Sequence, residues 1–572
     1  MAEVLLSPGV LARENDQSFL TQQPIQAGAA ILGPTVKGPV GIPTIVTTYS
    51  QYQNKFGAIV ESGSNNYTYF TSIAAYNYFQ QGGDPLLVTR IVSGSYTEAT
   101  SSIVTGSAAV TQNIFTLETL TEGADQNSTG GTGTSNSLDN GTKFNLRWEI
   151  TGPSTSSGTF GLLIRRGDDI ITSKNVLETW TNLSLDPNSD NYISKQIGDQ
   201  RLTVREDGGT YFTQLSGSYA NMSNYVRVKT VNKKTLNYFD NAGNEKSQYT
   251  GSIPIATSGT FGGASGTPFD GLTAAANFYQ NIGSQTQGVV SDNYTTSLNL
   301  LSNPDEYKYN LIVAPGLTRQ SHSSPLTTMV NNAQSRGDNL AIIDLRNYNS
   351  TIGTVTAGAA AVDSSYAATY WPWVQTIDPD TGEQCWVPAS TMIPGVYAFN
   401  DNSSEAWFAP AGLNRGGLST VLRAERKLTN ANRDTLYTNN VNPIATFPNA
   451  GVVVFGQKTM QKKASALDRV NVRRLLIELK SYISQVADNL VFQQNTMATR
   501  NDFLSQVNPY LESVQQRQGL YAFKVVMDDS NNSPDVIDRN QMVGQIYLQP
   551  TKTAEFIYLD FNVLPTGATF PA

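Results

Sequence analysis

The chain has 572 residues with a net charge of −8, 39% hydrophobic residues and only 15% charged ones, a length that predicts about three or four domains. The acidic net charge disfavours a nucleic-acid partner. The single cysteine, Cys385, excludes an intrachain disulfide and a cysteine zinc site. No stretch approaches the roughly 18 apolar residues of a membrane helix. Residues 1–10 also lack a secretory signal, so we expect a soluble protein, made in a cytoplasm, that does not insert into a membrane.

The N-terminal part of the chain is expected to form an extended arm followed by an α/β unit. Residues 1–20 contain too few apolar side chains to form a domain. Beyond them we predict an apolar strand, a helix with Ser50 as its N-cap, an aromatic helix and a buried strand. These elements cover Ala29–Pro34, Thr47–Phe56, Tyr67–Phe79 and Leu86–Val92. The order strand, helix, strand indicates an α/β unit.

The composition changes at Ser93 and remains rich in Ser, Thr, Gly and Asn as far as Gly266. Short strands are predicted here at Phe144–Ile150, Leu162–Arg166 and Tyr225–Lys229. Asn127–Asn140 is close to low complexity and is predicted to be a loop. We interpret residues 93–266 as an all-β or α+β insertion that faces outward.

The α/β character returns after residue 266. Tyr309–Pro315 and Leu340–Asp344 are short, continuous apolar runs, which are typical of parallel strands buried on both faces. The segment between them, Pro325–Arg336, is predicted to be the connecting helix. Cys385 lies beside Trp386, and we expect it to be a small residue in a turn.

The C-terminal third has the most regular pattern. Leu467–Phe492 is predicted to be a helix, because its apolar residues recur on one face at about 100° per residue. A second helix is predicted after Thr499, with Gly519 as its stop. Tyr521–Met527 alternates as a strand, and a further apolar strand face is expected after Pro550.

These elements predict a multidomain α+β or α/β fold. The predicted divisions are an N-terminal arm over residues 1–22, an α/β middle domain over 23–92 plus 267–390, a polar β-rich outer insertion over 93–266, a C-terminal α/β domain over 391–549, and a C-terminal strand and arm over 550–572.

Six basic residues gather around the start of the helix predicted over Leu467–Phe492. On a helical wheel Arg469, Arg473 and Lys480 lie within about 40° of one another. Three lysines come before them: Lys458, Lys462 and Lys463. The six form a candidate binding surface, and the alternative is a solvated helix face with local ion pairs such as that of Arg474 with Glu478.

A series of short motifs occurs in order along the chain. In the C-terminal third they are Trp386–Ser390, Pro394–Ala398, Ala409–Gly412, Asn442–Ile444, Phe447-Pro448, Gly451–Gly456, Thr459 and Val470–Leu475. Earlier ones are Ser7–Val10 with Glu14, Gly33-Pro34 with Lys37–Pro39, and Leu185–Ser189. Together they resemble the tail sheath family of contractile phages, R-type pyocins and type VI-like injection systems. In that family the motifs like Trp386–Ser390, Pro394–Ala398 and Ala409–Gly412 form a run of turns.

The resemblance implies a structural subunit and not an enzyme. Such a subunit polymerises with itself as hexameric rings, stacked helically around an inner tail tube, and contracts to drive the tube through the host envelope. The implied partners are further copies of the chain, the inner tail tube protein, and baseplate and tail terminator proteins. The subunit would be assembled in the host cytoplasm and become part of the virion tail, and no cofactor is implied.

The resemblance also implies that neighbouring subunits exchange terminal arms. An isolated terminal strand gains hydrogen bonds by pairing with the edge of a neighbour's sheet. The candidate inter-subunit arm residues are Val4, Leu5, Leu6, Val10, Ile557, Leu559 and Phe561. The alternative is that these are edge strands of their own domain. The family places the C-terminal domain against the tube, which assigns the six basic residues to a tube-facing surface.

The single histidine, His322, is a poor candidate for catalysis. A catalytic triad needs a histidine held between a carboxylate and a serine in an exposed turn, whereas we expect His322 to lie in a polar loop. One histidine also excludes a histidine metal cluster. The alternative function from another class is a virion surface or host-adhesion protein whose adhesive part is the insertion at residues 93–266.

Overall fold

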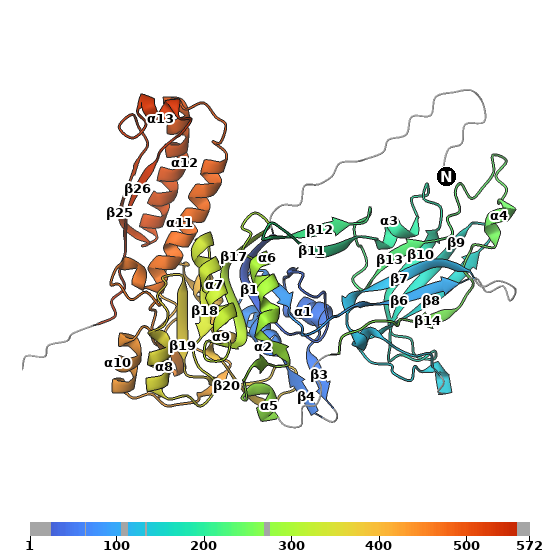
Figure 1. The fold of residues 1–572 in the computed structure, drawn as a ribbon, viewed down its shortest axis with the longest axis horizontal. Helices are drawn as coiled ribbons and strands as arrows, with labels where there is room; N and C mark the ends of the chain where they lie inside the picture. The colour runs from blue at the N-terminus through green and yellow to red at the C-terminus, as the bar shows by residue number, and fades with distance from the viewer. Residues whose placement is uncertain (1–24, 63–64, 105–111, 132–133, 268–274, 557–572) are drawn as a thin grey trace, which may run out of the picture.

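The computed structural model describes residues 25–62, 65–104, 112–131, 134–267 and 275–556 (Figure 1). Its body is built on an eight-stranded sheet with the order β2-β5-β1-β17-β18-β19-β23-β24. The strands are β1 (Ile25–Gly33), β2 (Thr44–Val46), β5 (Leu86–Arg90), β17 (Tyr307–Thr318), β18 (Leu340–Asp344), β19 (Ala367–Trp371), β23 (Asn442–Phe447) and β24 (Gly451–Val454). The two edge strands, β2 and β24, are antiparallel to their neighbours, and the other neighbouring pairs are parallel.

The inner strands of this sheet are buried on both faces, as their continuous apolar runs predict. Along β1, Ala29 and Ile31 belong to the hydrophobic core on one face, whereas Ala30 and Leu32 belong to the core on the other. β17 and β18 alternate in the same way, so the predicted parallel strands are confirmed. The predicted connecting helix is α7 (Ser323–Arg336).

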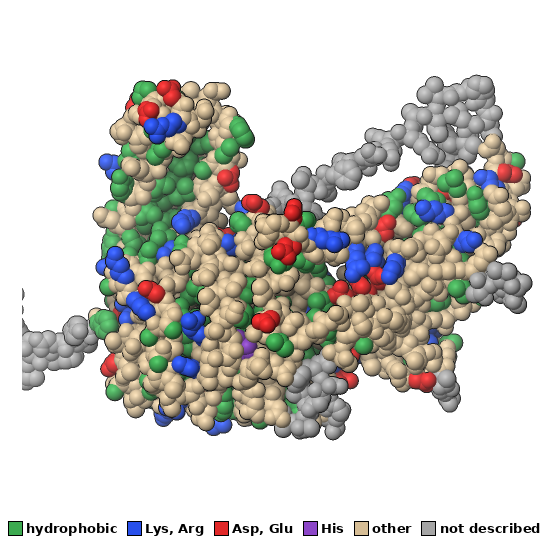
Figure 2. Space-filling model, viewed as in Figure 1, with side chains coloured by type: hydrophobic (Ala, Val, Ile, Leu, Met, Phe, Trp, Pro, Cys, Tyr) green, Lys and Arg blue, Asp and Glu red, His purple; other side chains and the backbone are tan. Residues whose placement is uncertain are grey.

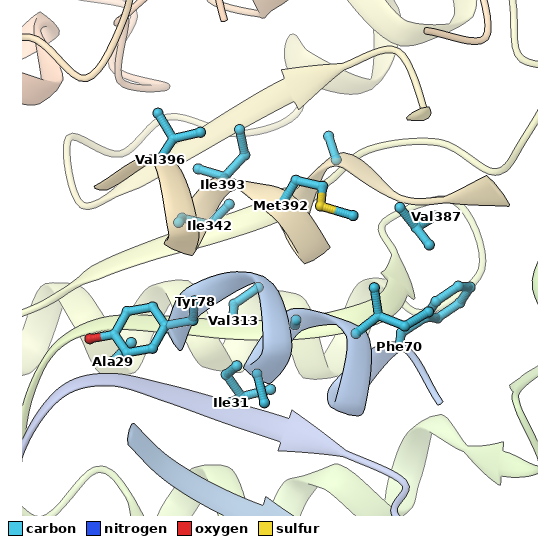
Figure 3. Packing of buried hydrophobic residues seen from close by; sticks show 14 of the residues in the cluster. Ala29, Ile31, Phe70, Tyr78, Val313, Ile342, Val387, Met392, Ile393 and Val396 are labelled. Carbon is cyan, nitrogen blue, oxygen red and sulfur yellow. The ribbon is translucent and has the colours of Figure 1, made fainter. Parts of the chain in front are cut away.

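Helices cover both faces of the sheet. α1 (Tyr49–Phe56), α2 (Phe70–Gln80) and α9 (Ala389–Ser403) share the core of one face. Figure 3 shows α2 and α9 packed over the sheet residues Ile31, Val313 and Ile342. The opposite face is covered by α6 (Tyr294–Leu300), α7, α8 (Ile352–Ala359) and α10 (Asn430–Thr438).

Residues 98–260 form a β-rich lobe beside this body (Figure 1). One sheet joins β6 (Glu98–Val104), β7 (Asn113–Glu122) and β13 (Val226–Val231), and another joins β8 (Leu146–Ser154), β9 (Thr159–Arg166), β10 (Val176–Ser184) and β14 (Ser258–Thr260). The two sheets share a core in which Phe115 stacks on Phe160 at 5.7 Å. The hairpin of β11 (Arg201–Asp207) and β12 (Thr210–Ser216) reaches from the lobe to α6.

The C-terminal residues form a helical hairpin that projects from the body (Figure 1). α11 (Val470–Asp488) and α12 (Met497–Gln516) are followed by the two-stranded sheet of β25 (Leu520–Val526) and β26 (Gln545–Pro550), with α13 (Pro534–Asp538) between the strands. Leu475, Leu479, Phe503 and Leu511 are buried in a core of their own. The predicted helices and the strand at residues 521–527 are confirmed, and β26 is an addition.

Smaller elements complete the chain. They are β3 (Ile59–Ser62), β4 (Asn65–Thr68), β15 (Gln285–Thr286), β16 (Val289–Val290), β20 (Val374–Ile377), β21 (Gln384–Val387), β22 (Val421–Ala424), α3 (Ile193–Ile197), α4 (Ser247–Thr250), α5 (Ala275–Tyr279) and 3₁₀ turns at Ala124–Gln126, Thr134–Asn136, Ser291–Asn293 and Ala466–Asp468. No helix within the described ranges is long and apolar enough to cross a membrane.

The structure corrects several predictions. Thr48, not Ser50, caps α1, because its side chain accepts the N–H of Gln51. Cys385 is buried within strand β21 and not in a turn. The motif at Pro394–Ala398 lies in α9, a helix buried on almost every side, so its Pro and Gly do not mark the implied run of turns. Strands β23 and β24 extend the body sheet, so the boundary predicted at residue 391 falls inside that sheet.

Candidate assembly surface

The two predicted arms extend beyond the described residues. Val4, Leu5, Leu6 and Val10 lie before residue 25, and Ile557, Leu559 and Phe561 lie after residue 556. The segment that leads into the C-terminal arm, residues 551–556, is described and runs back from β26 to the body. We call residues 551–556 the arm root.

Glu555 fastens the arm root to the body. Its carboxylate accepts hydrogen bonds from Arg469 Nε at 2.7 Å, Tyr437 Oη at 2.7 Å and Gln457 Nε2 at 3.0 Å. Gln457 Nε2 also donates to Thr553 Oγ1 at 2.6 Å. Burial opposes the ionisation of Glu555, but the three hydrogen bonds outweigh it and hold the pKa of this carboxyl below its ordinary value.

A cavity of about 1020 Å³ lies beside the arm root. It is lined by residues of the body, including Tyr437 and Phe455, and by Tyr521 at the start of β25. Phe556, at the end of the root, also lines the cavity and is 69% exposed. The arm root therefore lines a cavity between the body and the hairpin, together with aromatic residues of both.

The sheet of β25 and β26 has only two strands, and within the described part of the chain neither outer edge is paired. Phe523 and Leu548 face the core of the hairpin, while Tyr521 and Tyr547 are more than half exposed. Figure 2 shows hydrophobic side chains on the surface along this hairpin. Two open edges next to exposed aromatic residues are typical of a sheet that accepts further strands.

Two of the six predicted basic residues lie at the arm root. Arg469 is paired with Glu555 and also with Asp468, 3.0 Å away. Lys458 places Nζ 4.6 Å from the centre of the Tyr437 ring, and burial and the charge of Arg469 lower its pKa. Both cations therefore have partners within the chain.

Arg473 and Lys480 meet at Tyr366. The Arg473 guanidinium lies 4.0 Å from the centre of the Tyr366 ring and donates to Ser365 Oγ at 2.5 Å. Lys480 Nζ lies 3.4 Å from the Tyr366 hydroxyl. Arg473 is only 4% exposed, and burial lowers its pKa. Its position in the helical wheel suggested a surface cation, but the body covers it.

Lys462 and Lys463 remain as exposed cations in the loop between β24 and α11. The described residues include no carboxylate within 4.0 Å of either ammonium group. The backbone N–H of Lys462 donates to Asp363 Oδ1 at 2.9 Å, which fixes the loop. Of the six basic residues, these two and Lys480 are exposed, and the Lys480 ammonium group already contacts Tyr366.

Two features of this region were not anticipated from the sequence. Arg474 does not pair with Glu478; it pairs with Asp401 through Nη1 at 2.8 Å and is buried over the Tyr397 ring. Phe492, at the tip of the hairpin, is 101% exposed and has a φ of +67°. An aromatic residue in the left-handed region of φ is uncommon, and a sequence pattern gives no signal for it.

The structure also places the residues that matter for the enzyme alternative. His322 is not in a polar loop: it is 1% exposed at the N-cap of α7, and Nδ1 accepts the backbone N–H of Thr318 at 3.2 Å. Ser390 donates its hydroxyl to Asp344 instead of to a histidine. Among the described residues, no serine hydroxyl lies within hydrogen-bonding distance of His322. The same residues contain no group of three or more His, Cys, Asp or Glu side chains that could hold a metal ion.

Comparison with known protein families gives two matches along this chain. Residues 287–460 match the phage tail sheath protein central domain, and residues 462–564 match the phage tail sheath C-terminal domain. The first match covers β17, β18, β19, β23 and β24 of the body sheet, and the second covers the hairpin and the arm root.

Two curated proteins and one solved structure are similar to the chain. The tail sheath protein of Vibrio phage KVP40 is 30% identical over 429 residues, which are 65% of this chain and 61% of the relative. The tail sheath protein of Enterobacteria phage T4 is 35% identical over 230 residues, which are 40% of this chain and 35% of the relative. A sheath tail protein from Listeria innocua has the same fold at a TM-score of 0.51 and 11% identity, over 92% of this chain and 95% of its own. The chain thus spans less than two thirds of the length of either curated relative.

Proposed function

Because the chain belongs to the phage tail sheath family, we propose that it is a structural subunit that polymerises through exchanged strands into the sheath of a contractile tail. In the proposed assembly, six copies form a ring, and rings stack helically around an inner tail tube. The sheath joins a baseplate at one end and a terminator at the other, and contraction drives the tube through the host envelope.

One observation carries the proposal: an open two-stranded sheet lies on the same hairpin from which the C-terminal arm departs. β26 ends at Pro550, and the root that follows is fixed by Glu555. A strand from a neighbouring copy that pairs with β25 or β26 would satisfy the free backbone groups of that edge. The donor arm and the acceptor sheet are different surfaces of the chain, so contacts that each pass from one copy to the next are heterologous and build rings or helices instead of closed dimers.

The exposed pair Lys462 and Lys463 is the proposed contact with an acidic tube surface. Exposed ion pairs contribute only about 0.2–1 kcal/mol each. Repetition around a ring would add many such weak contacts, which set the register and still permit release. Arg473 is left out of this surface because it is covered by the body.

The test is a chain that lacks residues 557–572, compared with the full chain by sedimentation and negative-stain microscopy. We expect the full chain to form long hollow tubes and the truncated chain to remain a folded monomer. Small trimers of the full chain would favour the host-adhesion alternative, and tubes of the truncated chain would exclude the C-terminal arm as the connector.

A further inference from the structure

A second cavity, of about 340 Å³, lies at the carboxyl ends of β1 and β5. Its walls come from three parts of the chain that are distant in sequence. The lining residues are Pro34, Thr35, Tyr69, Arg90, Ile91, Val92, Ser93, Tyr96, Thr267, Gln287, Gly288 and Val289. The cavity is unrelated to the hairpin, the arm root or the exposed lysines.

Arg90 brings a buried positive charge to this cavity. It is 2% exposed, and Nη1 donates to the carbonyls of Gly38 at 2.7 Å and Glu122 at 2.9 Å, while Nη2 donates to Val36 at 3.3 Å. Nε donates to no acceptor, and no carboxylate of the described residues lies within 4.0 Å of the guanidinium. A buried donor without an acceptor is costly, so the Nε of Arg90 has capacity left for a negative ligand.

Gln287 supplies a second free donor. Its Oε1 accepts the backbone N–H of Phe70 at 3.0 Å, which fixes the orientation of the amide. The other end of the amide, Nε2, therefore points away from the Phe70 N–H. Nε2 has no hydrogen-bond acceptor, although the side chain is only 5% exposed. Two unsatisfied donors line the same cavity, and buried donors in proteins are normally hydrogen-bonded.

The cavity lies next to a reversal of strand order in the body sheet, which falls between β1 and β17. The chain leaves β1 toward β5 on one side and later returns to β17 on the other side of β1. In open parallel sheets, the crevice at the carboxyl ends of the strands at such a reversal is the common ligand site. The crossover helix α2 begins at Phe70 beside the cavity, and a helix N-terminus favours an anion.

Two carboxyl groups near Arg90 must be considered. Glu122 Oε2 accepts the backbone N–H of Val40 at 2.9 Å, and burial raises the pKa of this carboxyl to about 7. Burial likewise raises the pKa of Asp125 to about 6. At neutral pH Glu122 is about half protonated and Asp125 is mostly ionised, and neither carboxylate lies within 4.0 Å of the Arg90 guanidinium.

From the buried guanidinium, the two free donors and the site of the cavity, we propose that this cavity binds a small oxyanion of the phosphate or carboxylate class. Arg90 Nε and Gln287 Nε2 donate to its oxygens. The cavity volume of about 340 Å³ is at the lower end of the range for small-molecule sites, about 300–1,000 Å³, and it admits a single phosphate or a short carboxylic acid.

Binding here would also act on the junction between the body and the β-rich lobe. The chain leaves the body through Val92–Tyr96 and comes back through Thr267, and both segments line the cavity. Tyr96 donates to the Thr267 carbonyl at 2.6 Å and stacks under Arg90 at 5.3 Å. A bound oxyanion would hold Arg90 in place and stiffen both connections.

The experiment is equilibrium dialysis of the full chain against radiolabelled orthophosphate, with chloride at matched ionic strength. We expect one phosphate per chain and a higher thermal unfolding midpoint in phosphate than in chloride. Acetate and malonate are then added as competitors: displacement shows that carboxylates share the site, and no displacement restricts the site to phosphate. The absence of phosphate binding at millimolar concentration would overturn the proposal and leave a water-filled cavity.

The matched variants are Gln287→Glu and Gln541→Glu, which add the same charge. In Gln287→Glu, one carboxylate oxygen still accepts the Phe70 N–H. The other oxygen replaces the free Nε2 donor, and its negative charge would pair with Arg90 in place of a bound anion. We expect phosphate affinity to fall at least tenfold, while the unfolding midpoint without phosphate equals or exceeds that of the wild type. Gln541, exposed on the C-terminal hairpin, should tolerate the change without loss of affinity. Unchanged binding by Gln287→Glu would refute the site.

Discussion

Arg469 and Glu555, which are 86 residues apart in the sequence, form an ion pair with 2.7 Å between Nε and Oε1. The pair connects the residue before α11 to the arm root, and Tyr437 of α10 shares the same carboxylate. A residue that the sequence suggested as a free surface cation is thus an internal anchor. Residues 551–556, which precede the predicted C-terminal arm, are consequently held to the body by this pair.

Glu555→Gln should loosen the arm root without unfolding the protein. The change removes charge-assisted hydrogen bonds, each of which contributes about 1.5–3 kcal/mol. We expect faster amide hydrogen exchange at residues 551–556, fewer polymers and an almost unchanged thermal midpoint. Glu383→Gln, at an exposed position, is the control. Because the pKa of Glu555 is lowered in the folded state, the anchor should also weaken as the pH falls through that pKa. Unaltered exchange in Glu555→Gln would show that the carboxylate does not hold the root.

Arg473→Ala should destabilise the fold, whereas Lys480→Ala should not, although both side chains contact Tyr366. Arg473 is buried over the ring, and loss of a desolvated cation–π contact and its packing costs about 2–4 kcal/mol. Lys480 is exposed, and its contact contributes less than about 1 kcal/mol. Urea unfolding of the two variants measures the difference. Equal stabilities would contradict the buried role of Arg473.

The double variant Lys462→Glu, Lys463→Glu should leave the urea midpoint unchanged and reduce assembly on the tube. Both side chains are exposed and have no described acidic partner, so reversing their charge removes no internal contact. The measurement is co-sedimentation with tubes of the inner tube protein, at low and at high salt, because exposed charge contacts are screened by salt. Full co-sedimentation of the variant would exclude these lysines from the tube contact.

The protein should become less stable as the pH rises, because the buried carboxyl of Asp344 then loses its proton. Burial raises the pKa of Asp344 from 3.8 to about 7, although hydrogen bonds from Ser390 oppose the shift. The folded state therefore binds the proton more tightly than the unfolded state, and the free energy of unfolding falls between about pH 4 and pH 7 by at most about 4 kcal/mol. Asp344→Asn cannot titrate and should lose this part of the pH dependence.

Denaturant unfolding of wild type and Asp344→Asn at pH 5 and pH 8 tests that expectation. The difference between the two proteins isolates Asp344, because Glu122 and the other buried acids titrate in both. The same pH dependence in both proteins would refute the assignment.

Cys385 should be unreactive in the folded protein. Its side chain is 3% exposed in β21, and burial raises the pKa of the thiol, which disfavours the reactive thiolate. A thiol reagent should label it only after unfolding in guanidinium. Cys385→Ser should cost about 1–3 kcal/mol, because the hydroxyl lies among apolar residues of the core, and Cys385→Ala should cost less. Rapid labelling of the native protein would contradict the burial.

The sequence by itself determined the elements whose pattern repeats over a short distance. The apolar positions Leu475, Leu479 and Val486 predicted α11, because one helix face must be buried whatever covers it. The continuous runs at β17 and β18 predicted parallel strands for a similar reason, since a strand covered on both faces is apolar throughout. Helix α9 was missed because a helix that is buried on almost every side lacks the apolar stripe of an amphipathic helix, and its Pro and Gly suggested turns.

Only the tertiary structure decided what the basic residues do. Arg469 and Glu555 meet over 86 residues and Arg473 and Ser365 over 108, and no local pattern encodes contacts of that separation. A helical wheel gives the direction of a side chain but not the segment that lies there. The packing of the hairpin and the arm root on the body turned two predicted surface cations into internal ones and left Lys462 and Lys463 exposed.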